Sequence, residues 1–95
     1  MTKLFKIYLG LQNPETKIEN CELEVIDHLK TILDFATIYH TDGINKGGLE
    51  TTLVIEIVNN DFNDFKIRNI CTYLKNMYEQ ECVMFTEENI KMELV

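Results

Sequence analysis

Polar side chains that can contact a small ligand are concentrated in residues 39–50, which read YHTDGINKGGLE. Tyr39, His40 and Asp42 lie in its first part, and we predict Tyr39 and Asp42 as ligand-binding residues. Glu50 stands at the start of the most apolar stretch of the chain, where a carboxylate is either at a solvent edge or held for a function. The same composition is also typical of a glycine-rich hairpin tip that meets only solvent. The residues alone leave both interpretations open.

Tyr8 is a second aromatic candidate. Residues 3–11 alternate in polarity, which places Tyr8 on the face opposite Phe5, Ile7 and Leu9. On that face it can line the open side of a sheet and contact a ligand, or pack against a neighbouring copy of the chain.

Metal and cofactor chemistry has little support in the residue types. Cys21, Cys71 and Cys82 show no CxxC spacing, and His28 and His40 show no metal-ligand spacing. We therefore predict no metal site, no cofactor and no disulfide framework, with the three thiols reduced and buried.

The charge balance bears on partners. The chain has 16 acidic and 9 basic residues, a net charge of -7, with 5 basic and 7 acidic residues up to Gly48 and 4 basic and 9 acidic residues after it. Direct nucleic-acid binding is disfavoured, because it needs basic residues that displace phosphate counterions. Cationic ligands and basic proteins fit this charge better. We find no signal peptide and no apolar run of membrane-spanning length, so we predict a cytoplasmic protein with no membrane partner.

The elements that must position these residues follow from periodicity. Residues 3–11 predict a strand, and an apolar stripe predicts a helix over 17–35 that opens on a Thr16–Glu19 capping box. Two further strands, at 36–42 and 49–58, are joined by a glycine-rich loop. A second amphipathic helix follows at 62–79, and a last strand begins near Cys82. Alternation continues beyond the last strand, so the tail can form an extra edge strand.

This β-α-β-β-α-β order predicts a single domain over residues 1–95, an α+β ferredoxin-like sandwich with two helices on one face of a four-stranded antiparallel sheet. Several functions known for that fold require residues that this chain does not have at the necessary positions. The third strand has no aromatic side chain for stacking RNA bases, and Arg68, the only arginine, lies in the second helix and not in a phosphate-binding loop. The glycines of 43–48 join two strands and open no helix, so they form no phosphate loop.

One stretch carries a resemblance to a family. Residues 78–84 read YEQECVM, and this aromatic-Glu-Gln-acidic-Cys-Val-aliphatic order resembles the phage-encoded S-adenosylmethionine lyases, formerly called hydrolases. That family is similar in element order, and it pairs a tyrosine before the hairpin with a glutamate on the following strand. Tyr39 and Glu50 stand at corresponding positions.

The resemblance implies an enzyme that cleaves S-adenosylmethionine to methylthioadenosine and homoserine lactone, or a relative that binds a similar nucleotide-like ligand. It implies a trimer with ligand sites between subunits. Glu50 would be the catalytic residue and Tyr39 would position the ligand, which the backbone of Gly10, Leu11 and Gln12 would also contact. The chain would then be phage-derived.

A second hypothesis belongs to another class. Glu79, Glu81, Glu87 and Glu88 form an acidic run that is either a solvated end of the domain or a ridge that imitates phosphates. A protein with such a phosphate-like ridge would be an anti-restriction or anti-CRISPR inhibitor that blocks a basic surface of a host defence protein. A third hypothesis is a structural or regulatory interaction domain.

Overall fold

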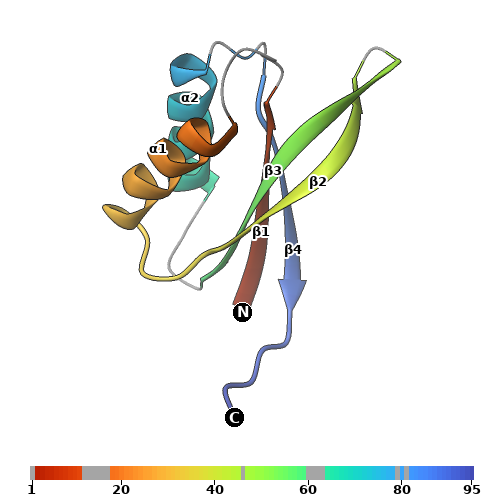
Figure 1. The fold of residues 1–95 in the computed structure, drawn as a ribbon. Coiled ribbons are helices and arrows are strands. Elements are labelled where there is room, and N and C mark those ends of the chain that lie inside the picture. Colours follow the sequence, from red (N-terminus) through yellow and green to blue (C-terminus); the bar gives the residue numbers. More distant parts are fainter. Residues whose placement is uncertain (1, 12–17, 46, 60–63, 79, 81) are drawn as a thin grey trace.

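The ferredoxin-like α+β sandwich is confirmed. A computed structural model describes residues 2–11, 18–45, 47–59, 64–78, 80 and 82–95. The elements are β1 (Thr2–Leu11), α1 (Ile18–Lys30), β2 (Thr37–Asn45), β3 (Gly48–Asn59), α2 (Asp64–Met77) and β4 (Met84–Ile90). The four strands form one antiparallel sheet in the order β2-β3-β1-β4, and both helices lie on the same side of it (Figure 1). The other side of the sheet is called the open face below.

The core lies between the helices and the two central strands. In the middle of β1 alternate residues, namely Phe5, Ile7 and Leu9, are buried, as the alternation predicted. These residues meet the buried residues of β3 and of the two helices, which are Leu53, Ile55, Ile57, Val25, Leu29, Ile67, Ile70, Cys71 and Leu74. The alternation therefore separates a helix-facing set of side chains from the set on the open face.

The predicted helix over 17–35 ends earlier, at Lys30. The backbone N–H groups of Thr31 and Ile32 donate to the carbonyls three residues before them, at 3.0 and 3.1 Å, and the Thr31 hydroxyl donates to the carbonyl of His28 at 2.6 Å. These bonds close the last turn and satisfy helix-end carbonyls. The apolar stripe continues in sequence beyond this point, but Ile32 and Ala36 are exposed.

The hairpin is longer than predicted. Asn45 of β2 pairs with Gly48 of β3, so most of the supposed 43–48 loop is strand, and Gly47 in the short connection has a φ of +82°, which favours glycine. Among the described residues β1 pairs with β3 only from Thr51 onward, so the end of the hairpin projects beyond the sheet (Figure 1). Ile44 and Leu49 at this end are each 81% exposed.

The C-terminal region also differs from the prediction. The last strand begins at Met84 instead of near Cys82, and residues 91–95 form no further edge strand. Leu94 of this tail is exposed, so the alternation there does not reflect packing within the chain. No helix in the described ranges is long and apolar enough to cross a membrane.

The prediction of buried thiols is correct for Cys71 and wrong for Cys82. Cys71 faces the core from α2, whereas Cys82 lies exposed in the connection before β4. Burial raises the pKa of the Cys71 thiol to about 11, although the nearby Arg68 charge lowers it in part. The side chain of Cys21 lies outside the described residues.

This contrast predicts different thiol reactivity. At pH 8, with a pKa of about 11, only about one Cys71 thiol in a thousand is ionised, and the thiolate is the reactive form. We expect iodoacetamide to alkylate Cys82 long before Cys71, as measured for each residue by peptide mass spectrometry. In urea both should react at similar rates, and similar rates in the folded protein would contradict the burial of Cys71.

Candidate functional site

The open face carries the residues that β1 and β3 direct away from the helices, and they are polar, aromatic and aliphatic. On β1 these are Leu4, Lys6, Tyr8 and Gly10, and on β3 they are Glu50, Thr52, Val54, Glu56 and Val58. Directly opposed residues of an antiparallel pair share a face, so the strand register sets which of them are neighbours. Three groups follow along the sheet: a carboxylate cradle, a tyrosine stripe and a charged pair.

The carboxylate cradle is formed by Gly10, Glu50 and Gln80. The Glu50 side chain lies across the backbone of Gly10, where an added Cβ would overlap Glu50 Oε1 and come within 2.8 Å of Glu50 Cδ. The same Cβ would lie 3.5 Å from Gln80 Oε1, so the connection after α2 reaches the same point. Gln80 is held there because its Nε2 donates to the carbonyl of Tyr78 at 3.3 Å. The absence of a side chain at Gly10 thus makes room for the Glu50 carboxylate on a partly buried surface.

The tyrosine stripe lies next along the strands. Tyr39, Val54, Tyr8 and Met84 occupy one register row across β2, β3, β1 and β4. Val54 is only 1% exposed although it lies on the open face, flanked by the two tyrosines. This row offers apolar and aromatic surface against which a flat ring system can stack.

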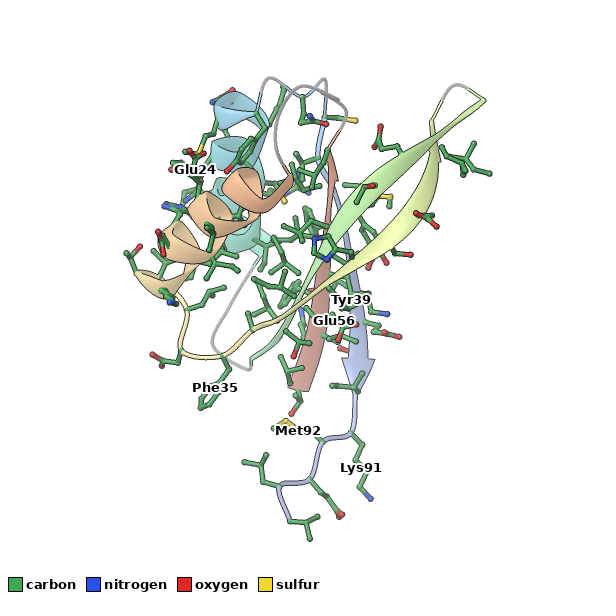
Figure 2. All side chains as sticks on the ribbon, viewed as in Figure 1. Glu24, Phe35, Tyr39, Glu56, Lys91 and Met92 are labelled. Atoms are coloured by element: carbon green, nitrogen blue, oxygen red, sulfur yellow. The ribbon has the colours of Figure 1, made fainter. Side chains whose placement is uncertain are left out.

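The charged pair is Lys6 and Glu56, with Lys6 Nζ 3.9 Å from Glu56 Oε1. The Tyr39 hydroxyl donates to Glu56 Oε1 at 2.8 Å, and Figure 2 shows these two residues meeting across β2 and β3. This hydrogen bond to a carboxylate raises the pKa of Tyr39, and the loss of some hydration and the charges of Glu56 and Tyr8 raise it further.

The pKa of Tyr39 therefore reports on Glu56. In Glu56→Gln the acceptor loses its charge, so we expect the pKa of Tyr39 to fall toward its ordinary value. The measurement is an alkaline titration followed by NMR of labelled tyrosine rings. Glu24→Gln on α1, far from Tyr39 (Figure 2), should leave the titration of Tyr39 unchanged, and an unchanged Tyr39 in Glu56→Gln would contradict the bond.

The predicted site residues divide between the two faces of the sheet. Gly10 and Glu50 are brought into contact, and Tyr8 and Tyr39 flank Val54 on the same face. Leu11 and Asp42 are both in register with Thr51, so they lie on the helix side of the sheet, where Leu11 packs against the core. Gln12 lies outside the described residues.

Tyr39 and Glu50 share the open face but do not form one site within the chain. Tyr39 pairs with Val54, four residues along β3 from Glu50, which is about 14 Å at roughly 3.4 Å per residue. The Tyr39 hydroxyl is also directed to Glu56 instead of Glu50.

Two further residues were missed as site candidates. Glu56 lies an even number of positions after Glu50, so alternation along β3 could have placed both on one face. Gln80 belongs to the 78–84 stretch, but its approach to Gly10 depends on how α2 leads into β4 and has no signal in spacing. The described part of the chain holds no group of three or more His, Cys, Asp or Glu side chains that could bind a metal ion.

Fold and site together define the class: a ferredoxin-like α+β domain whose uncovered sheet face carries a carboxylate cradle beside an aromatic stripe. Among solved structures, the chain is similar to a phage SAM lyase in the apo state, with 20% identity, coverage of 90% of this chain and 78% of that chain, and a TM-score of 0.64. A DUF3240 family protein from Shewanella baltica matches at 11% identity, 99% and 94% coverage and a TM-score of 0.64. A de novo designed protein, Foldit4, matches at 12% identity, 96% and 100% coverage and a TM-score of 0.61.

No family model matches the chain, and no curated protein matches its sequence. The three structural likenesses establish the fold. Because a designed protein shares it, the fold by itself does not assign a function.

Proposed function

We propose that the protein is a S-adenosylmethionine lyase, which cleaves S-adenosylmethionine to methylthioadenosine and homoserine lactone, or a close relative that binds a similar nucleotide-like ligand. The observation that carries the proposal is the Glu50 carboxylate resting on Gly10 beside Gln80. The likeness in fold to a phage SAM lyase supports it, as does the resemblance of residues 78–84 to that family.

The proposed reaction makes modest demands on the protein. The carboxylate of the substrate attacks its own carbon next to the sulfonium, the carbon–sulfur bond breaks, and the sulfur keeps the electron pair as neutral methylthioadenosine. No proton is transferred, and a negative and a positive charge cancel as the lactone forms. The protein therefore has to hold a reactive conformer and exclude water, which favours the loss of charge.

The open face has residues suited to each part of this ligand. The Glu50 carboxylate can bind the ammonium group of the substrate, with Gln80 offering an amide oxygen to the same group. Tyr8 and Tyr39 can stack on the adenine ring or face the sulfonium. A ligand bound to the Glu50 carboxylate would also lie close to the β1 backbone at Gly10, which that carboxylate covers.

We propose further that the site is completed between subunits of a homotrimer. Tyr39 lies about 14 Å along the sheet from Glu50 at roughly 3.4 Å per residue, so a second copy can bring its own tyrosine to the cradle. The projecting hairpin end, with Ile44 and Leu49 exposed, is a suitable surface for such contact.

The test is to incubate the purified protein with S-adenosylmethionine and to detect methylthioadenosine and homoserine lactone by chromatography. We expect product, a rise in melting temperature with the ligand, and a trimer mass by sedimentation. Binding without product would support the ligand-binding relative. If no product forms and the ligand causes no thermal shift, the result counts against the proposal and favours the acidic inhibitor. Binding of such an inhibitor to a basic partner should weaken steeply with salt.

A further inference from the structure

A groove on the helix layer lies on the other side of the molecule from the open face. The helices run antiparallel, since the Tyr78 hydroxyl of the α2 end donates to Glu24 at 3.4 Å and Tyr73 stacks on His28 further along α1. Beyond this stacked pair the seam between the helices opens into a hollow of about 530 Å³. It is lined by His28, Ile32, Lys66, Asn69, Ile70 and Tyr73.

The walls of this groove include aromatic and aliphatic surface. The rings of His28 and Tyr73 lie 3.6 Å apart at an angle of 12°, so they form a stacked aromatic wall. Ile70 is 4% exposed and belongs to the core, whereas Ile32 is 45% exposed at the rim. A flat hydrophobic body can therefore cover side chains that now meet water.

The charge among the lining side chains of the groove is positive. Of the six lining residues, Lys66 carries a positive charge at neutral pH. None of the six is acidic, although the chain as a whole carries -7. Asn69 adds an amide that can donate a hydrogen bond beside the ammonium group. The lining of the groove thus carries no carboxylate that would repel an anion.

We propose that this groove binds a planar aromatic carboxylate of one or two rings, with the ring between the isoleucines and the His28–Tyr73 wall and the carboxylate at Lys66 and Asn69. The volume falls in the range of about 300–1,000 Å³ typical of small-molecule sites. The groove binds an anionic ligand through Lys66, whereas the Glu50 cradle favours a cationic group, so the two sites recognise different ligands.

The experiment uses the whole chain and naphthalene-2-carboxylate as the probe. We expect saturable chemical-shift changes in amide NMR spectra at Ile32, Lys66, Asn69, Ile70 and Tyr73, and none at Gly10 or Glu50. The neutral analogue naphthalene-2-methanol should bind about three- to fivefold more weakly, because it lacks the ion pair with Lys66.

Variants separate the charge from the shape. Lys66→Gln should weaken binding of naphthalene-2-carboxylate by about three- to fivefold and leave binding of the neutral analogue unchanged. Ile32→Glu places a carboxylate at the exposed rim and should weaken binding of naphthalene-2-carboxylate by about tenfold or more. Lys91→Gln in the tail removes the same charge elsewhere (Figure 2) and should change nothing.

Equal binding of acid and alcohol, indifference to Lys66→Gln, or shifts centred on the sheet face would each overturn the proposal. Shifts of the groove amides with protein concentration alone, in place of shifts with the probe, would mean that a second copy occupies the groove, and this would overturn it too.

Discussion

Gly10→Ala is expected to abolish binding at the carboxylate cradle while the protein stays folded. The new Cβ would occupy the position of Glu50 Oε1, so the Glu50 carboxylate must move away from Gly10 and Gln80. The group that moves is the end of a flexible side chain, and alanine is favoured over glycine in a strand by about 0.5–1 kcal/mol. We therefore expect the free energy of unfolding to change by no more than about 1 kcal/mol. If the chain is a lyase, turnover should fall by about 10²- to 10³-fold, as for other lost electrostatic contacts in active sites.

Two glutamate variants complete this experiment. Glu50→Gln keeps the shape of the side chain and removes its charge, so it should lose turnover to a similar degree. Glu93→Gln removes one charge from the exposed tail and should match the unmodified protein. Urea unfolding, calorimetric titration with S-adenosylmethionine and product formation are measured for all three. Unchanged binding in Gly10→Ala would show that the position of Glu50 over Gly10 has no part in the function.

Ile7→Ala should destabilise the fold more than any surface change. Ile7 is fully buried on the central strand β1, where it pairs with Ile55 on one side and Phe85 on the other. Removing a buried isoleucine side chain costs about 2–5 kcal/mol through lost burial and the cavity that remains. A domain of this size has only about 5–15 kcal/mol of stability, so we expect the variant to unfold at a much lower temperature than the unmodified protein.

The measurement is thermal and urea unfolding followed by circular dichroism. A loss of about 3 kcal/mol corresponds to a fall in melting temperature of about 12–24 °C for a domain of this length. Leu94→Ala is the matched control, because Leu94 is 91% exposed and its truncation should change stability by about 0.5 kcal/mol or less. Similar effects of the two changes would contradict the assignment of the core.

The sequence was most informative where one face of an element is buried. Alternation over residues 3–11 predicted β1 and its buried set, because a strand on a core must alternate. The β2 boundary was missed because β2 is an edge strand whose polar and glycine residues are mostly exposed, so no apolar pattern marks where it ends. The end of α1 was misplaced because apolar residues continue past Lys30 although the helix does not: Leu33 packs against the core from the following turn, and Ile32 is exposed.

The candidate site was predictable in part. Glu50 stood out as a carboxylate at the start of an apolar strand, and it does lie partly buried on the sheet. Its position over Gly10 comes from strand register, and Gln80 reaches the same point from a connection 30 positions away, which no local pattern contains. Asp42 was grouped with Glu50 as part of one loop, but within a paired hairpin it lies in register with Thr51 and faces the other way.

The two-residue connection between Asn45 and Gly48 fixes the phase of β2 against β3. Because β1 holds β3 from its other edge, a one-residue insertion in this connection would leave Glu50 over Gly10 but turn Tyr39 to the helix side. A two-residue insertion would return Tyr39 to the open face, opposite a different residue of β3. Whether the hairpin length is odd or even is therefore a simple criterion, readable in any related chain, for whether the tyrosine and the carboxylate share a surface.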